Sequence, residues 1–196
     1  MQQPDAYVVI GNPVGHSKSP WIHAAFAAQT AQQMQYNTLE APLDDFAGTV
    51  RKLMDSGARG ANVTVPFKLE AFALADSMTA RARAAGAVNT LLFQDGRILA
   101  DNTDGIGLIR DLEENLLINL KNKSILLLGA GGAAEGVVYS ILEKKPSQLT
   151  LTNRTIEKSN LIHNKINVHA KSFNVDLNVI EIAKLPHQYF DLIINA

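Results

Sequence analysis

The sequence predicts an α/β protein in which an N-terminal α/β domain is followed by a partial Rossmann-type domain. Short apolar segments of strand length alternate with segments whose apolar residues recur at helical spacing. One apolar strand runs directly into a glycine-rich turn at residues 129–133, and another runs into a polar segment that ends at Lys68. Strands that alternate with helices usually form parallel sheets with the helices packed against them.

The first half of the chain supplies strands at residues 7–10, 36–40 and 60–65, and helices at residues 44–55 and 80–85. Ser19-Pro20 predicts the start of a further helix, with serine as N-cap and proline at the first helical position. A short helix follows Pro66. Asp95-Gly96 is a two-residue turn signal and predicts a hairpin between residues 90–93 and 97–100.

A helix at residues 104–116 leads into a polar stretch, so the domain boundary is expected between residues 103 and 121. Beyond it, strands are predicted at residues 124–128, 148–152 and 190–195, and helices at residues 132–144 and 156–165. The residues between 166 and 189 give no clear pattern.

Composition excludes several classes of protein. The chain has 196 residues, 46% of them hydrophobic and 19% charged, which is typical of a globular protein. A net charge of -1 gives no electrostatic basis for binding nucleic acid or an anionic membrane. The absence of cysteine excludes disulfides and cysteine-ligated zinc, and no other metal-ligand spacing is visible. Without a signal peptide or an apolar run of about 18 residues, a soluble, cytoplasmic protein is expected.

The glycine-rich turn predicts a dinucleotide site. Gly129-x-Gly131-x-x-Ala134 matches the fingerprint in which the first glycine allows a tight turn and the second lets a pyrophosphate approach the backbone. The third small residue lets helix and strand pack closely. The turn that usually opens such a dinucleotide site consists here of Gly129, Ala130, Gly131, Gly132 and Ala133.

The next strand indicates which dinucleotide is bound. An NAD site would place an acidic residue after it, but the chain has Asn153, Arg154 and Thr155, with Lys158 one turn later. Arginine can bind a 2′-phosphate through two parallel hydrogen bonds, so we expect NADP. The alternative is that Arg154 is an ordinary solvated loop residue.

Two serines are candidates for binding an anionic substrate. Ser17 and Ser19 lie at the start of a helix, whose positive end favours a carboxylate. Spacing alone supports this role and simple N-capping equally. His16 and His23 are expected to pack rather than to act in catalysis.

Lys68 and Asp104 are candidates for proton transfer. Lys68 stands at the start of a helix, where the helix dipole disfavours a cation, and Asp104 directly precedes another helix. If the two side chains meet, the carboxylate would orient the amine, which would exchange a proton with a substrate hydroxyl. The alternatives are an exposed lysine and an N-capping aspartate.

Taken together, these segments resemble the shikimate dehydrogenase family over essentially the whole chain. The resemblance lies in residues 11–20, 62–68, 85–90, 102–105, 129–133 and 153–155. It implies reversible NADPH-dependent reduction of 3-dehydroshikimate, with residues 1–103 as the substrate-binding catalytic domain, 104–121 as a helical connection and 122–196 as a partial NADP-binding domain. It also implies that Lys68 is the acid/base paired with Asp104, that two serines bind the substrate carboxylate, and that several polar side chains bind ring hydroxyls. Those implied for the ring hydroxyls are Asn62, Thr64, Asn89 and Asp104.

The C-terminal part departs from the family pattern. Residues 129–196 suffice for about one βαβαβ half of a doubly wound domain, whereas the family continues with further strands and helices. A ligand-binding fragment with little or no activity is therefore an alternative to an active enzyme. A quinate/shikimate dehydrogenase of broader specificity is another, because the two substrates share the carboxylate and ring hydroxyls. A possible homodimer is compatible with these observations.

Overall fold

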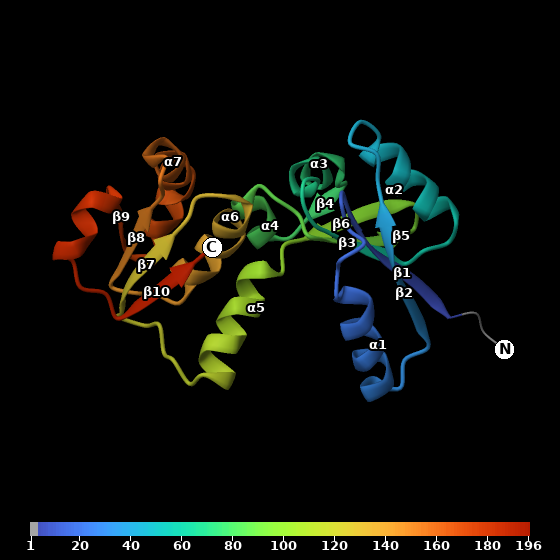
Figure 1. Cartoon of the computed structure of the whole chain (residues 1–196), viewed down its shortest axis with the longest axis horizontal. Helices are drawn as coiled ribbons and strands as arrows, with labels where there is room; N and C mark the ends of the chain where they lie inside the picture. Colours follow the sequence, from blue (N-terminus) through green and yellow to red (C-terminus); the bar gives the residue numbers. More distant parts are fainter. Residues whose placement is uncertain (1–3) are drawn as a thin grey trace. The chain divides into compact units, whose positions relative to one another are not determined.

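The computed structural model describes residues 4–196, so the first three residues of the predicted N-terminal domain lie outside it. The chain divides into two compact units (Figure 1). The first comprises residues up to Ala82 together with Gly86–Asn102, and the second comprises Arg83–Ala85 and Thr103–Ala196. Each unit is built around one sheet.

The first unit contains a six-stranded mixed sheet. Its strand order is β2-β1-β3-β5-β6-β4, with β3–β5 and β5–β6 antiparallel and the other pairs parallel. In chain order the strands are β1 (Asp5–Gly11), β2 (Met34–Glu40), β3 (Gly60–Val63), β4 (Ser77–Met78), β5 (Thr90–Gln94) and β6 (Arg97–Asp101). The predicted hairpin is β5–β6, in which Asp95 and Gly96 both have positive φ angles, as this type of turn requires.

Helices cover the two faces of this sheet unequally. One face carries α2 (Phe46–Asp55), α3 (Lys68–Leu74) and α4 (Ala80–Ala85), whose apolar residues share one core with alternate residues of the central strands. The stacked rings of Phe46 and Phe67 lie in this core. The opposite face carries α1 (Ser19–Thr30), which contacts β1 and β2.

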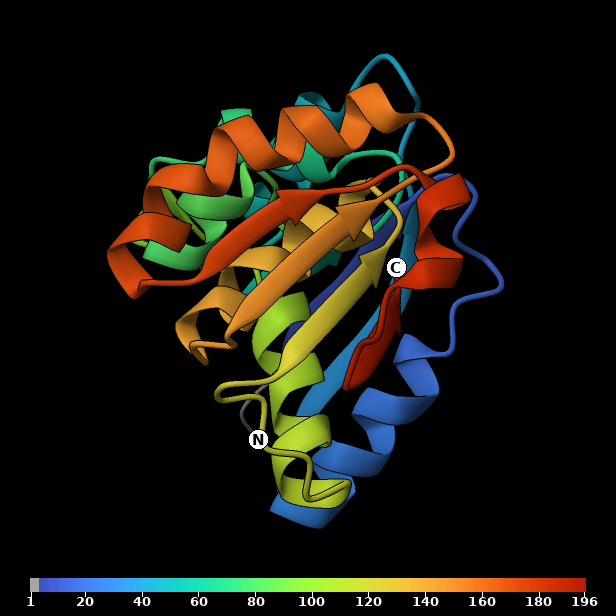
Figure 2. The same cartoon turned by 90° about the vertical axis from the view of Figure 1, so that its left-hand side faces the viewer.

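The second unit contains a four-stranded parallel sheet with the order β10-β7-β8-β9 (Figure 2). Its strands are β7 (Ser124–Leu128), β8 (Gln148–Thr152), β9 (Asp176–Val179) and β10 (Leu192–Asn195). The helices are α5 (Asp104–Arg110), a π-helical turn (Asp111–Asn115), α6 (Gly132–Glu143), α7 (Ile156–Phe173) and a 3-10 helix (Ile182–His187). Residues of α5, α6 and α7 share one core with alternate residues of β7 and β8. This arrangement confirms the predicted Rossmann-like sheet and the α/β fold class.

Several local predictions differ from the structure. The strand expected at residues 60–65 ends at Val63, because the backbone turns at Val65-Pro66-Phe67 into α3. The helix expected at residues 156–165 continues to Phe173, where Asn174 adopts a left-handed conformation and ends it. The short strand β4 was not predicted.

Candidate active site

The two serines at the start of α1 contact each other. Ser17 Oγ donates to Ser19 Oγ over 3.1 Å, and Ser17 Oγ accepts the backbone N–H of Ser19 over 3.2 Å. The prediction that Ser19 is the N-cap is wrong, because Ser19 is the first helical residue and Lys18 stands at the cap without a side-chain bond. Both serines are partly buried, and both hydroxyls lie at the positive end of the helix.

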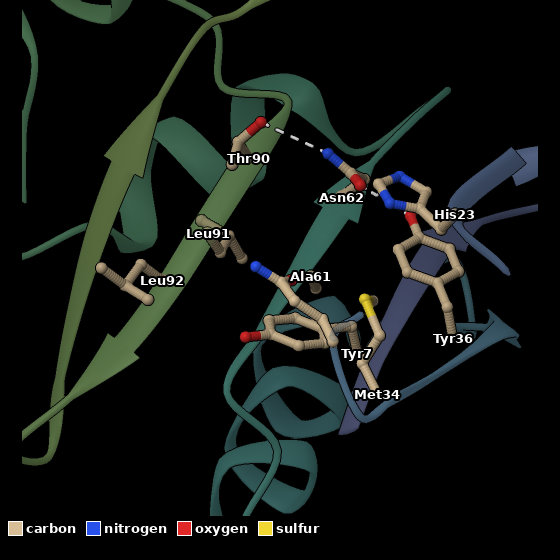
Figure 3. Close-up of a pocket in the computed structure, with 10 residues that line it drawn as sticks. Tyr7, His23, Met34, Tyr36, Ala61, Asn62, Thr90, Leu91 and Leu92 are labelled. Carbon is tan, nitrogen blue, oxygen red and sulfur yellow. Dashed lines mark hydrogen bonds between the residues drawn. The ribbon is translucent and has the colours of Figure 1, made fainter. Parts of the chain in front are cut away.

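Tyr36, which no motif in the sequence indicated, links these serines to Asn62. Its hydroxyl donates a 2.6 Å hydrogen bond to Oδ1 of Asn62, and its ring stacks on His23 with centroids 4.0 Å apart (Figure 3). Burial raises the pKa of Tyr36 to about 12, against the opposing effect of a hydrogen bond from Ser19. Burial also lowers the pKa of His23. Tyr36 is therefore a neutral phenol at any physiological pH.

Asn62 continues the network toward β5. Its Nδ2 donates to the carbonyl of Asn89 and to Thr90 Oγ1, each over 3.3 Å, and the hydroxyl of Thr90 donates to Asn89 Oδ1 over 2.8 Å. The register of the sheet explains these bonds, since Asn62 lies directly opposite Thr90 in the β3–β5 pair. The structure thus brings together Ser17, Ser19, Asn62 and Asn89, with Tyr36 and Thr90 between them.

This network borders a hollow of about 270 Å³ on the sheet face that carries α1 (Figure 3). Tyr7, His23, Met34 and Leu92 supply most of its apolar wall, while Tyr36, Asn62 and Thr90 supply the polar end. An apolar surface with convergent polar groups at one end is typical of a site for a small molecule.

Thr64 and Lys68 follow β3 and lie at the turn into α3. The backbone N–H of Thr64 donates to the carbonyl of Ile10 over 2.9 Å, which holds this turn beside the end of β1. Lys68 is the first residue of α3 and is partly buried, and its carbonyl accepts the N–H of Val88 over 3.0 Å. The backbone at Lys68 therefore adjoins the segment that carries Asn89.

Asp104 belongs to the second unit, so its pairing with Lys68 stays a prediction. It is the first residue of α5, and Thr103 occupies the N-cap position. The carboxylate is partly buried and lies in the first turn, where the helix dipole favours an anion.

The glycine-rich turn has the geometry that a dinucleotide requires. Gly129 has a φ of 112°, and a Cβ there would clash with the backbone oxygen of Ala196, so only glycine fits. Gly131 and Gly132 are exposed, and a Cβ on either would meet nothing within 4 Å. No side chain caps α6 at Gly131, and Ala134 is fully buried against the core. These residues fit a pyrophosphate at the start of α6.

The loop after β8 presents two cations at the start of α7. The side-chain amide of Asn153 donates to the carbonyl of Thr155 over 3.0 Å and so holds the loop. Arg154, Thr155 and Lys158 are exposed, and among residues 4–196 neither cation forms an ion pair. Two cations beside a helix N-terminus fit a phosphate group.

Two other kinds of feature, a metal-binding cluster and a membrane-spanning helix, are absent from residues 4–196. Within residues 4–196, His, Cys, Asp and Glu do not gather into a group of three or more that could hold a metal ion. None of the helices in the same part of the chain is long and apolar enough to cross a membrane.

Comparison with known proteins follows the division of the chain. A family model for the shikimate dehydrogenase substrate binding domain matches residues 9–91, and one for shikimate / quinate 5-dehydrogenase matches residues 111–195. Shikimate dehydrogenase (NADP(+)) of Methylobacillus flagellatus is 53% identical over 98% of this chain and 70% of its own length. That of Cupriavidus pinatubonensis is 53% identical over 90% of this chain and 60% of its own length.

Solved structures give the same result. Shikimate dehydrogenase from Aquifex aeolicus matches with a TM-score of 0.87 and 33% identity, over 98% of this chain and 68% of that one. Shikimate 5-dehydrogenase from Thermus thermophilus, in complex with NADP(H) and shikimate, matches with a TM-score of 0.84 and 30% identity over the same shares. The chain thus spans about 60 to 70% of the length of these relatives.

Proposed function

The chain belongs to the shikimate dehydrogenase family, and we propose that it catalyses the reversible NADPH-dependent reduction of 3-dehydroshikimate to shikimate. The observation that carries this proposal is the hydrogen-bonded series of hydroxyl and amide groups from Ser17 to Asn89. Such groups suit a carboxylated ring with several hydroxyls. In this assignment Ser17 and Ser19 bind the carboxylate. The groups assigned to the ring hydroxyls are Asn62, Thr64, Asn89 and Asp104.

Lys68 is assigned the proton transfer. As the ketone carbon is reduced, negative charge develops on its oxygen, and an ammonium group beside that oxygen stabilises the charge and donates the proton. In the reverse direction the neutral amine accepts the proton of the substrate hydroxyl. Asp104 is assigned the role of orienting the Lys68 amine toward that hydroxyl.

NADP is the cofactor in this proposal, and its reduced form, NADPH, would supply the hydride for the ketone carbon and leave as NADP+. The pyrophosphate is assigned to residues 129–133, supported by the open space at Gly131 and Gly132. The 2′-phosphate is assigned to Asn153, Arg154, Thr155 and Lys158, supported by the two exposed cations at the start of α7. The names of the relatives, shikimate dehydrogenase (NADP(+)), point to the same cofactor.

The remaining expectations from the sequence stay proposals. Residues 1–103 are assigned to the substrate, residues 104–121 to the connection and residues 122–196 to NADP. A cytoplasmic location and a homodimer complete the proposal. Sedimentation of the purified chain at several concentrations tests the homodimer, and a single monomeric species at all of them would exclude it.

The experiment that tests the function is NADP+ reduction by this chain with shikimate, beside a Lys68→Ala variant. Loss of a positioned acid/base lowers turnover by roughly 10²- to 10⁴-fold. We therefore expect measurable NADPH formation that falls by this factor in the variant, with a smaller change in shikimate affinity. Loss of affinity with turnover unchanged would contradict the role of Lys68.

The same assay with quinate in place of shikimate distinguishes a shikimate dehydrogenase from a quinate/shikimate dehydrogenase. Comparable kcat/KM values for shikimate and quinate would indicate the broader specificity. A folded chain that binds shikimate without turnover would instead support the ligand-binding alternative. Absence of both binding and turnover would refute the proposed function.

A further inference from the structure

Arg81 and Asp101 form a partly buried ion pair in the first unit. Arg81 Nε donates to Asp101 Oδ1 over 2.8 Å, and Arg81 Nη2 donates to Asp101 Oδ2, so that the contact is bidentate. The hydroxyl of Thr79 also donates to Oδ1, over 2.6 Å. The two charged side chains are 33% and 21% exposed. A bidentate arginine–carboxylate contact fixes direction as well as distance.

The pair holds the start of α4 against the end of β6. Thr79 is the N-cap of α4 and accepts the backbone N–H of Ala82 while donating to Asp101. With only six residues, α4 is too short to be stable by itself, so its position depends on such contacts. Gly86, with a φ of 64°, ends the helix. Residues 87–89 follow directly and lead into β5.

Asp101 also anchors the far side of this segment, through its carboxylate and its backbone carbonyl. Asp101 Oδ1 accepts the backbone N–H of Asn102 over 2.7 Å, and the carbonyl of Asp101 accepts the N–H of Asn89 over 3.1 Å. The side-chain amide of Asn102, which is 2% exposed, donates to the carbonyl of Ala87 over 3.0 Å. Residues 87–89 are thus hydrogen-bonded at one end to Asn102 and at the other end to Asp101.

This segment meets two groups of the proposed active site. The N–H of Val88 donates to the carbonyl of Lys68, and the carbonyl of Asn89 accepts the N–H of Val63 over 2.8 Å. Asn89 is nearly buried, and its carbonyl also accepts the amide of Asn62. A displacement of residues 87–89 would therefore move the Asn89 side chain that is assigned to a ring hydroxyl.

We propose that Arg81 and Asp101 are positioning residues that hold residues 87–89, and through them the Asn89 amide, in place for the substrate. The pair does not touch the substrate itself. The proposal deepens the function proposed above and rests on it, since Asn89 is given its role there.

Amide hydrogen exchange tests, without any assay of activity, whether the Arg81–Asp101 pair holds residues 87–89. In Arg81→Leu we expect the N–H groups of Val88, Asn89 and Asn102 to exchange about tenfold faster, the size that follows from loss of about one net hydrogen bond. Strands β7 and β8 should exchange as before. The matched control is Arg59→Leu, which removes an exposed pair with Asp5 in the same unit and should change none of these rates.

Steady-state kinetics test whether this placement of Asn89 contributes to substrate binding. Arg81→Leu should raise the KM for shikimate by about tenfold, which corresponds to a loss of about 1.4 kcal/mol of binding free energy. The KM for NADP+ should stay unchanged. A general loss of folded protein would instead lower kcat and leave both KM values unchanged. If Arg81 acts through Asn89, Arg81→Leu should have a smaller effect in an Asn89→Ala background.

Unchanged exchange at Val88 and Asn89 in a folded Arg81→Leu protein would overturn the proposal. So would an equal rise in the KM for shikimate in both backgrounds. If the leucine variant does not fold, Arg81→Lys keeps the charge but loses the bidentate contact and is judged by the same rates. A wild-type chain that neither turns over nor binds shikimate would refute the proposed function, and the exchange rates alone would then decide whether the pair holds the segment.

Discussion

The hydroxyl of Tyr36 donates a 2.6 Å hydrogen bond to Oδ1 of Asn62, and this bond decides which way the Asn62 amide faces. With Oδ1 engaged by a donor, Nδ2 is directed toward Asn89 and Thr90. Oδ1 has a second lone pair, and the phenol oxygen of Tyr36 can itself accept a hydrogen bond. Tyr36 and Asn62 thus keep acceptor capacity beside the two serines, while their own protons are engaged within the network.

Replacing Tyr36 with phenylalanine should weaken shikimate binding. The variant keeps the ring stacked on His23 but removes the donor to Asn62 and the partner of Ser19. A net hydrogen bond is worth about 1 kcal/mol, so the KM for shikimate should rise roughly five- to tenfold. The KM for NADP+ should stay the same. Steady-state kinetics with each substrate varied in turn provide the measurement.

Tyr7→Phe is the matched control for that experiment. Tyr7 lines the same hollow and also loses only a hydroxyl, but that hydroxyl belongs to no hydrogen bond of the network. We expect its KM for shikimate to stay within about twofold of the wild-type value. Equal effects of the two substitutions would show that the phenol of Tyr36 has no special role.

Arg154→Ala should change the choice of cofactor. The exposed guanidinium at the start of α7 is assigned to the 2′-phosphate, and hydrogen bonds to charged groups contribute about 1.5–3 kcal/mol. The KM for NADP+ should therefore rise by roughly 10- to 150-fold, while kcat/KM for NAD+ should not fall. Arg110→Ala, which removes an exposed arginine of α5, is the control. A similar loss with both cofactors would contradict the assignment.

Local signals in the sequence predicted the parts of this structure that local chemistry determines. Asp95-Gly96 predicted the β5–β6 hairpin, and Gly129 predicted the tight turn before α6, because both depend on positive φ angles. Tyr36 was missed because it lies inside a strand and has no motif around it. Its role arises from the strand order β2-β1-β3, in which the long side chain of Tyr36 on β2 reaches Asn62 on β3, 26 positions away in the sequence.

Longer-range packing also explains the remaining differences. The short strand β4 exists because Ser77 and Met78 pair with β6, and two residues give no detectable periodicity. The C-terminal half of α7 has Ile166 and Ala170 buried against the core, but the exposed apolar Val168 between them departs from this spacing and obscures the helical pattern. The Arg81–Asp101 pair likewise joins residues from two elements that only the folded sheet brings together.

Asp101→Asn should make the protein less sensitive to acid. Burial raises the pKa of Asp101, but hydrogen bonds from Arg81 and Thr79, the charge of Arg81 and the N–H of Asn102 outweigh burial and hold this pKa below its usual value. A carboxyl with a lowered folded-state pKa stabilises the protein above its unfolded pKa of about 3.9, and this contribution is lost as the pH falls through the folded-state pKa.

The measurement for Asp101 is the free energy of unfolding by urea at several pH values. The wild-type protein should be more stable than the variant at neutral pH, and the difference should shrink below a pH of about 4. Asp5→Asn removes the carboxylate of the exposed pair with Arg59 and serves as control. A difference in stability that is constant across this range would mean that the charge of Asp101 does not stabilise the fold.

The last prediction separates two glycines of the same turn. Gly129→Ala should destabilise the protein by about 1–3 kcal/mol, since a φ of 112° is strained for any residue with a Cβ and the methyl group would meet the carbonyl of Ala196. Gly131→Ala should change the free energy of unfolding by less than about 1 kcal/mol, because its φ is -99° and no atom lies within 4 Å of the new Cβ. That open space is the one assigned to the pyrophosphate, so Gly131→Ala should raise the KM for NADP+ in a protein of nearly normal stability. Urea unfolding and cofactor titration of both variants test these two expectations. A Gly131→Ala protein with unchanged NADP+ affinity would contradict the assignment of the pyrophosphate to the start of α6.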